Sequence, residues 1–546
     1  MFILFLVVSL ISSINATSIV SRSESYPLSQ PAVHGPKTRL VIGNGRIAPD
    51  GYNVEGVNRS TTLVDDAFPG TLITGQKGDH FDIDVVNMLS DHSMFNVTSV
   101  HWHGINQYKT NHADGTSDIT QCPITPNHSF LYSFSAQNQA GTFWYHSHYS
   151  VQYAKQCDGL RGPLIIYDPE DPLAYMYDVD DASTVITLAD WYHDAAPKLR
   201  GNISYADSML INGVGRYHGA EGRRTKPAVI TVTPGKRYRL RLIQMSCEAN
   251  VQFSIDGHNL TIIEADGELT EPLVVDQLQI LAGQRYSVVL VADQPVDNYW
   301  VRGIPNYNQT YNGSAILRYQ GATEAEPTTV DTPPTNPLQE TNLHALINPG
   351  ALGIPEYGKA DINITLEVSF DNSTFQFHVN DATFESPPSP VLSQILEGTN
   401  ASQLQPHKSV YALKANQVIE LTIKMINAPG GPHPMHLHGH SFDVVQSADS
   451  STFNYVNPVR RDVVSAGSDG QQTVIRWVTD NSGPWFVHCH IDWHLDEGFG
   501  VVMAESPWDT PAHVSPVPDE WKRLCPIYNE YMRPTLTGSE GDLDLD

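Results

Sequence analysis

Residues 485–500 read Trp-Phe-Val-His-Cys-His-Ile-Asp-Trp-His-Leu-Asp-Glu-Gly-Phe-Gly. Successive side chains of a β-strand point to opposite faces, so His488 and His490 would face one way and Cys489 the other. This tripeptide could therefore serve two metal sites. Two imidazoles and one thiolate in a plane suit copper, although a zinc cluster or a buried core strand could also contain an isolated His-Cys-His. The histidines upstream favour copper.

Four His-x-His pairs occur along the chain, and each would put two imidazoles on one face of a strand. The pairs are His101 with His103, His146 with His148, His436 with His438, and His488 with His490. One such pair alone would ordinarily be a pair of surface imidazoles. Four pairs, in aromatic or Gly/Pro-flanked segments, predict an inward-facing cluster that holds three coppers at two or three imidazoles each and leaves room for oxygen or water.

A second site follows from the ligand types that remain. His433, Cys489 and His494 would hold a single copper on the far face of the same strand. Cys489 is bonded through the backbone to both of its histidine neighbours, so an electron would have a short covalent path between the two sites. His440 forms a fifth pair with His438. We interpret His440 as an ordinary imidazole, because the ligand count is complete without it.

The rest of the chain predicts an all-β protein. It contains 39 Gly and 37 Pro, which supply turns and interrupt long helices. Apolar and polar residues alternate in residues 78–87, 234–243 and 416–425, as in half-buried strands. These segments lie about one domain length apart, so we predict three copies of one β-sandwich-like module. The middle copy has no His-x-His pair and should space the outer two and shape a pocket.

Segments rich in proline and acidic residues divide the chain into these modules. The predicted divisions are a signal peptide at 1–18, a first module at 38–170, a second module at 171–320, a linker at 321–338 and a third module at 339–546.

A predicted signal peptide and N-glycosylation motifs indicate a secreted protein. The apolar segment from Met1 to Ala16 is too short to span a bilayer and ends in small residues, as signal peptides do, although no Lys or Arg precedes it. No later apolar run resembles a membrane span, so we expect no membrane anchor. The net charge of −28 opposes binding to nucleic acid and to anionic membranes. Acceptor triplets for N-glycosylation begin at Asn58, Asn96, Asn127, Asn202, Asn259, Asn308, Asn312, Asn363, Asn372 and Asn400.

Five cysteines are an odd number for a secreted chain. If Cys489 is a metal thiolate, four remain, which can form two disulfides in three possible pairings. The four are Cys122, Cys157, Cys247 and Cys525.

These motifs, in this order, resemble those of the multicopper oxidases, and in particular those of secreted fungal laccases. The similarity covers about residues 38–525. It implies three cupredoxin-like Greek-key β-sandwich domains and four copper ions. It also implies one-electron oxidation of phenols or aromatic amines, coupled to four-electron reduction of dioxygen to water. We expect the chain to act as a monomer.

The resemblance also implies a role for each ligand. It assigns the type 2 copper to His101 and His436, one type 3 copper to His103, His146 and His490, the other type 3 copper to His148, His438 and His488, and the type 1 copper to His433, Cys489 and His494. Phe499 falls at the axial position of the type 1 copper. A side chain without a donor atom there favours a relatively high reduction potential.

Two carboxylates match acids of the family. Asp114 resembles the acid that assists proton delivery to reduced oxygen, although Asp-Gly is most often just a turn. Glu248 falls where the family has a pocket carboxylate that accepts the proton of the phenol or amine, while His494 receives the electron. Without the resemblance, Glu248 would be read as a solvated surface charge.

The resemblance further implies which cysteines are paired. Ala154, Lys155 and Gln156 look like an insertion just before the second bridge and put its geometry in question. The implied disulfides are Cys122–Cys525 and Cys157–Cys247.

Two other functions fit parts of the sequence. A ferroxidase of the same family would need acidic residues arranged around the type 1 copper. A blue-copper electron carrier would need only His433, Cys489 and His494, and the eight paired histidines would then have no purpose. The number of coppers per chain separates a carrier from an oxidase. Lignin attack, pigment formation and detoxification would all use the same motifs.

Overall fold

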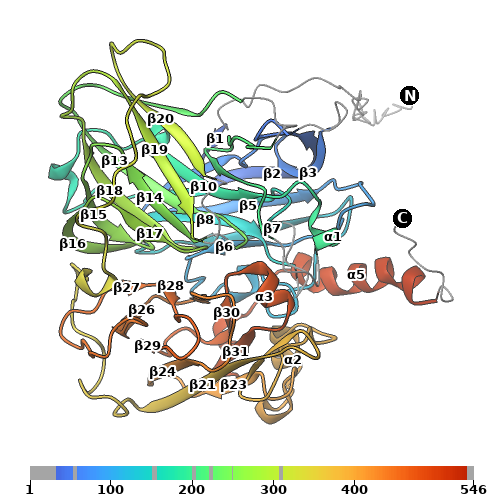
Figure 1. Ribbon diagram of the computed structural model, residues 1–546. Helices are drawn as coiled ribbons and strands as arrows, with labels where there is room; N and C mark the ends of the chain where they lie inside the picture. The colour runs from blue at the N-terminus through green and yellow to red at the C-terminus, as the bar shows by residue number, and fades with distance from the viewer. Residues whose placement is uncertain are drawn as a thin grey trace, which may run out of the picture.

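The computed structural model of this chain describes residues 32–52, 58–149, 156–199, 205–219, 225–248, 250–306 and 312–537. The predicted signal peptide lies outside these residues. In the described part of the chain, nearly all regular structure is β, and the strands form six sheets (Figure 1). The prediction of an all-β fold is therefore confirmed.

The first module contains two sheets that share one apolar core. The five-stranded sheet has the order β1 (Val33–His34), β4 (Leu72–Gln76), β9 (Arg161–Tyr167), β8 (Gly141–Ser147), β6 (Val100–His103). The four-stranded sheet has the order β3 (Arg59–Val64), β2 (Lys37–Ile47), β5 (His80–Asn87), β7 (Ser129–Ser135).

The second module also contains two sheets. The six-stranded sheet has the order β11 (Ser208–Ile211), β10 (Val185–Trp191), β13 (Arg237–Gln244), β18 (Arg285–Val291), β15 (Leu260–Ala265), β16 (Glu268–Val275). The five-stranded sheet has the order β12 (Val229–Val232), β20 (Gly313–Tyr319), β19 (Asn298–Pro305), β14 (Val251–Ile255), β17 (Leu278–Ile280).

The third module repeats this arrangement, and its core is continuous with that of the second. The six-stranded sheet has the order β22 (Gln376–Val379), β21 (Ile362–Asp371), β24 (Val418–Met425), β29 (Gln472–Val478), β26 (Phe442–Gln446), β27 (Arg460–Arg461). The five-stranded sheet has the order β23 (Val410–Leu413), β31 (Gly500–Glu505), β30 (Gly483–Cys489), β25 (Pro434–Leu437), β28 (Val463–Ser465).

The three alternating segments occupy equivalent places in the three modules. β5, β13 and β24 each pair in parallel with one strand and antiparallel with another. Side chains of β5 alternate between buried and half-buried, but nearly all of β13 is buried. β13 reads as alternating because it contains arginines, and the structure buries Arg239 against Asp171 and Arg241 against Asp180. Ion pairing thus lets a polar face enter the interior.

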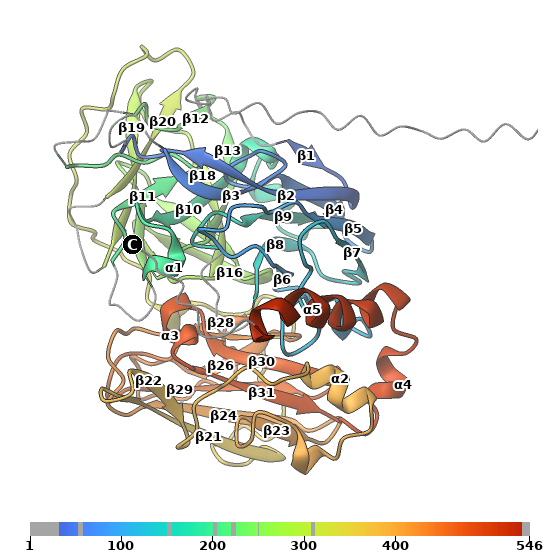
Figure 2. The same ribbon diagram turned by 90° about the vertical axis from the view of Figure 1, so that its right-hand side faces the viewer.

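The helices are few and lie outside the sheets. They are α1 (Ala196–Leu199), α2 (Val391–Leu396), α3 (Asp492–Asp496), α4 (Thr510–Val514) and α5 (Asp519–Thr537). α5 runs along the junction of the first and third modules (Figure 2). Trp521 of this helix donates a hydrogen bond to the carbonyl of Thr120, at 2.9 Å, and Cys525 is bonded to Cys122. No helix of the described residues is both long and apolar enough to cross a bilayer.

Candidate metal centre

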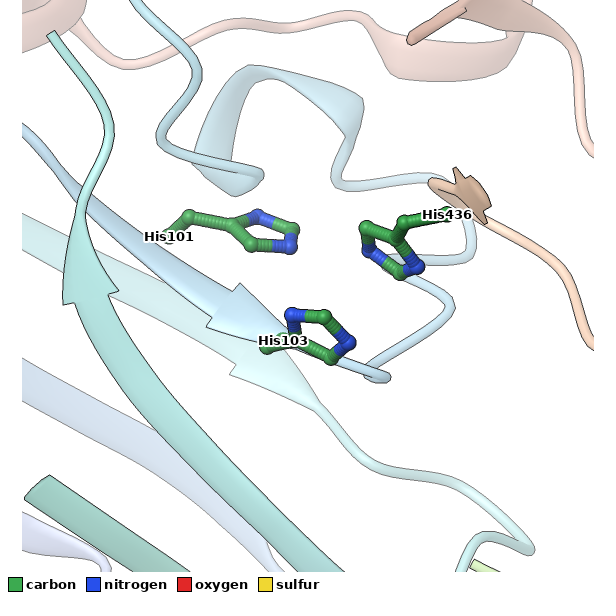
Figure 3. A group of neighbouring side chains, drawn as sticks. All are labelled: His101, His103 and His436. Carbon is green, nitrogen blue, oxygen red and sulfur yellow. The ribbon is translucent and has the colours of Figure 1, made fainter. Parts of the chain in front are cut away.

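Four short strands bring the paired histidines together where the first and third modules meet. β6 pairs antiparallel with β8, and β25 with β30, so that His101 lies opposite His146 and His436 lies opposite His488. The second histidine of each pair follows two residues later. His103 is the last residue of β6, and His148, His438 and His490 come directly after β8, β25 and β30. Figure 3 shows His101 and His103 of β6 and His436 of β25 pointing into one common space.

The eight imidazoles form groups of three whose nitrogen atoms lie within 4.8 Å of one another. The groups are His101, His103 and His436; His103, His146 and His490; and His148, His438 and His488. All eight histidines of the four pairs are buried. The structure therefore brings together residues that are up to several hundred positions apart in the sequence.

Main-chain carbonyls orient several of these rings. The Nδ1–H groups of His101, His146 and His436 donate hydrogen bonds to the carbonyls of Asp114, Ser147 and Asp462, at 2.7, 2.9 and 2.9 Å. A neutral imidazole that donates from Nδ1 has its lone pair on Nε2. The Nε2 atoms of these three rings are buried without a hydrogen-bond partner. Buried lone pairs of this kind fit a metal ion.

Two imidazole nitrogens that face each other, in His438 and His488, are a second indication of a metal site. His438 donates from Nδ1 to Asp114, and His488 donates from Nδ1 to the carbonyl of Cys489, each at 2.9 Å. Both lone pairs are therefore on Nε2, and the two Nε2 atoms lie 3.1 Å apart. Lone pairs at this distance repel each other, and a shared cation turns that repulsion into coordination. The donor set thus fits metal binding.

Burial keeps the imidazoles uncharged. The pKa of these rings lies well below its ordinary value. The largest cause is burial, and the second is repulsion by the positive charges that neighbouring groups would carry. This holds for His103, His146, His148, His436, His488 and His490. The neutral imidazole is the form that binds metal.

A separate group lies on the other side of β30. Sγ of Cys489 is 3.8 Å from Nδ1 of His433 and 3.6 Å from Nδ1 of His494, and the two nitrogens are 3.0 Å apart. Cys489 is the one cysteine of the chain outside a disulfide. Burial raises the pKa of its thiol, so the thiolate form needs a nearby cation.

Phe499 lies beside this group, and its axial position at a copper ion stays a prediction. Its ring centroid is 5.5 Å from that of His433 and 5.0 Å from that of Phe377, which in turn lies 4.8 Å from His494. The Phe499 ring offers no donor atom to a metal ion. The two nearest imidazoles are therefore bordered by phenyl rings on this side.

Asp114 connects two of the paired histidines. Its carboxylate accepts hydrogen bonds from Nδ1 of His438, at 2.9 Å, and from the hydroxyl of Thr116, at 2.7 Å, and lies 3.3 Å from Nδ1 of His101. Burial would raise the pKa of Asp114, but His438 and His101 hold it well below its usual range. The carboxylate therefore orients two predicted ligands, and its role in proton delivery stays a prediction.

Asp462 is a second buried carboxylate at this centre, and sequence analysis missed it. It lies 3.2 Å from Nε2 of His103, and Arg285 of the second module donates two hydrogen bonds of 2.6 Å to it. Burial raises the pKa of Asp462 against the opposing effect of Arg285. The sequence offers only one signal, the charged run from Arg460 to Asp462, and that signal does not identify the partners.

A cavity of about 530 Å³ opens beside His494. Sequence analysis predicted Glu248 for such a pocket, and Glu248 lines it. A Cβ added at Gly430, whose φ is +85°, would lie 2.9 Å from Nε2 of His494, so this glycine leaves the edge of the ring open. Glu497 also lines the cavity and was missed, because in the sequence it is one more polar residue after the ligand motif.

Burial changes the charge state of the predicted acid. The pKa of Glu248 is raised to about 8, first by burial and then by the negative charge of Asp190. Tyr192 opposes this shift through a long hydrogen bond of 3.5 Å. Glu248 therefore exchanges its proton close to neutral pH, as a group that transfers protons should.

The remaining predicted residues are cysteines and His440. The disulfides are Cys122–Cys525 and Cys157–Cys247, the two pairs that the resemblance implies. Of the apparent insertion, Gln156 donates a hydrogen bond to Asp492 at 2.9 Å, and Ala154 and Lys155 lie outside the described residues. His440 faces Glu505, with Nε2 2.9 Å from a carboxylate oxygen.

Comparisons with known proteins agree with this geometry. Three profiles described as multicopper oxidase match residues 46–171, 182–322 and 371–509. Laccase-5 of Trametes villosa is 53% identical over 91% of this chain and 94% of its own length, and a laccase of Phlebia radiata is 52% identical over 91% and 94%.

Solved structures are similar as well. The laccase from Botrytis aclada has 31% identity and a TM-score of 0.79, over 94% of this chain and 95% of its own. Fet3p, a multicopper oxidase that functions in iron import, has 26% identity and a TM-score of 0.78, over 91% and 95%.

Proposed function

This chain belongs to the multicopper oxidase family, and we propose on that premise that it is a laccase. Such an enzyme removes single electrons from phenols and aromatic amines and passes four of them to dioxygen, which becomes water. Identities of 52 to 54% with proteins named laccase, over 91% of the chain, support this function.

Four copper ions would complete the enzyme. His433, Cys489 and His494 would hold the type 1 ion beside the cavity. The paired histidines would hold the other three, as type 2 (His101, His436) and type 3 (His103, His146, His490 and His148, His438, His488). Copper would supply the electron acceptor beside the pocket and the place where dioxygen is reduced.

The connection through Cys489 is the observation that carries the proposal. The thiol belongs to the group beside the cavity, while its neighbours His488 and His490 belong to the groups between the modules. The backbone of β30 therefore joins the place where an aromatic molecule can bind to the place where the eight imidazoles meet. An electron carrier would need only the first of these groups.

The cavity supplies the two groups that a phenol needs. His494 presents its ring edge to the cavity and can receive an electron, and Glu248 can accept the proton of the phenol. Loss of an electron makes a phenol strongly acidic, so a nearby base keeps the oxidised product from returning.

Two buried carboxylates contact the imidazoles at the site proposed for dioxygen reduction. Reduction of dioxygen to water consumes protons in a site that the structure closes off from solvent. Asp114 and Asp462 are the acids in contact with the imidazoles there. Asp114 stays ionised and orients His438, whereas Asp462, whose pKa burial raises, can hold a proton. The charge of Asp462 is balanced by Arg285 from the middle module.

A ferroxidase is the second candidate. Two observations favour it: carboxyls of Glu248 and Glu497 line the cavity beside His494, and the fold is similar to that of an oxidase that functions in iron import. The higher identity to laccases makes phenol oxidation the primary proposal.

We propose that the enzyme is secreted and that it acts as a monomer. Two disulfides suit an oxidising compartment. All proposed copper ligands come from the same chain, so a second subunit is not required. Acceptor asparagines for glycans accompany a signal-like segment at the start of the sequence.

Copper content, visible and EPR spectra, and oxygen uptake test the function. We expect four coppers per chain, an intense blue band, and faster oxygen uptake with 2,6-dimethoxyphenol than with iron(II). One copper per chain without oxygen uptake would indicate a carrier. Faster uptake with iron(II) would establish the ferroxidase instead.

A further inference from the structure

The cavity beside His494 combines aromatic walls with carboxyls from two modules. Glu248 follows β13 in the second module, and Glu497 follows α3 in the third. Flat aromatic rings pack well against walls of this kind. The aromatic lining consists of Tyr205, Phe370, Phe375, Phe377 and Trp493.

No positive side chain of the described lining balances the two carboxyls. Apart from His494 and the hydroxyl of Tyr205, the remaining polar residues of the described lining are the amides Asn250, Asn306 and Asn372. Buried carboxylates are ordinarily paired with a cation. No described residue of the lining supplies such a cation, so a bound molecule with a positive charge would be a suitable partner.

Burial and a neighbouring carboxylate raise the pKa of both carboxyls. The pKa of Glu497 is raised to about 8, first by burial and then by Asp496, and that of Glu248 is raised to the same value. A cation beside a carboxyl favours its ionised form, whereas an anion disfavours it. The charge of a bound molecule therefore changes its affinity for this cavity.

We propose that Glu497, together with Glu248, selects aromatic substrates that carry an ammonium group. This inference rests on the proposed laccase function and narrows its substrate class. The oxidisable ring packs against the aromatic wall near His494, and the ammonium group lies beside the carboxyls. Aromatic faces add a further attraction for the cation. The net charge of −28 also draws cations toward the protein.

Three catechols that differ mainly in charge test the proposal. They are dopamine, which is cationic, 4-methylcatechol, which is neutral, and 3,4-dihydroxyphenylacetate, which is anionic. With copper-loaded enzyme at pH 7, we expect kcat/KM to fall in that order, with the difference mainly in KM. Glu497→Gln should lower the ratio of kcat/KM for dopamine to that for 4-methylcatechol about tenfold.

Glu385→Gln is the matched control. It makes the same exchange at an exposed acid of the third module that does not line the cavity. The ratio should stay within about twofold of wild type. Equal ratios for all three catechols in the wild type, or an equal loss of selectivity in both variants, would overturn the proposal.

A binding measurement separates this inference from the laccase function. Calorimetry under nitrogen gives the affinity of the copper-free protein for dopamine and for 3,4-dihydroxyphenylacetate without turnover. Tighter binding of dopamine, reduced about tenfold by Glu497→Gln, supports the proposal even if no catechol is oxidised. Equal affinities would refute it even if all three are oxidised.

Discussion

Glu248 shows how a single residue acquires a function from its surroundings. The amino acid is an ordinary carboxylic acid, but burial beside Asp190 raises its pKa to about 8. A carboxyl with a raised pKa is protonated below that value and becomes a base only above it. Proton transfer from a phenol to Glu248 should therefore depend on pH in the neutral range.

The pH dependence of phenol oxidation should reveal this group. We expect kcat/KM for 2,6-dimethoxyphenol to contain a component that increases with pH up to about 8, because the fraction of ionised Glu248 increases. Glu248→Gln should abolish that component and lower kcat/KM at pH 8 at least about tenfold, at the low end of general-base effects. Steady-state pH profiles provide the measurement.

Glu271→Gln is a suitable control, because Glu271 is an exposed acid of the same module. Its profile should match that of the wild type. If Glu248→Gln keeps the wild-type profile, solvent rather than Glu248 accepts the proton.

At the scale of the element, the alternation of β30 divides one tripeptide between two sites. His488 and His490 belong to the imidazole groups between the modules, and Cys489 belongs to the group beside the cavity. The whole strand is buried, and so is His490 directly after it, so none of these side chains is turned toward solvent. The neighbouring strand β25 pairs its His436 directly with His488. The strand register thus connects the two sites.

Cys489→Ser tests this division of the strand. Serine is smaller and is a poor copper ligand, so the group beside the cavity should lose its metal while the imidazole groups keep theirs. We expect copper content to fall from about four to about three ions per chain and the intense blue band to disappear. Metal analysis and visible absorption check both results.

Met435→Leu is the matched control, because Met435 lies opposite Cys489 on β25 and the exchange nearly conserves volume. It should keep the blue band. A band that survives Cys489→Ser would show that another thiolate or another chromophore produces it.

At the scale of the whole molecule, contacts between modules assemble the site. α5 and the Cys122–Cys525 disulfide join the end of the chain to the first module across 403 positions. Arg285 of the second module binds Asp462 of the third, which contacts His103 of the first. The imidazole groups therefore depend on the relative position of all three modules.

Removal of the Cys122–Cys525 disulfide should loosen this assembly. We expect the double variant Cys122→Ser/Cys525→Ser to lose about 4 kcal/mol of unfolding free energy, because the bond restricts a very long loop of the unfolded chain. Urea unfolding followed by tryptophan fluorescence measures the loss.

Trp521→Phe provides a graded comparison. It removes the hydrogen bond to Thr120 and keeps the disulfide, and it should cost about 1 kcal/mol. If the double variant is as stable as the wild type, noncovalent packing of α5 is sufficient to hold the modules together.

Local sequence patterns were sufficient to predict these strands and the types of ligand that they contain. Alternation in residues 78–87 and 416–425 predicted β5 and β24, because the period of two is a local property of a strand. The His-x-His spacing likewise predicted that both imidazoles of a pair share a face. These statements concern neighbouring residues, whose relative directions are set by the backbone.

Which of these residues lie in contact depends on the packing of segments that are remote in the sequence. Asp462 and Arg285, far apart in the sequence, are joined by ion pairing at a junction of modules, and no local pattern in either segment indicates that contact. Glu497 enters the cavity with Glu248 only because the second and third modules pack together. Burial at such junctions also sets the pKa of both acids. Distance and solvent exposure depend on packing between remote segments, whereas strand periodicity does not.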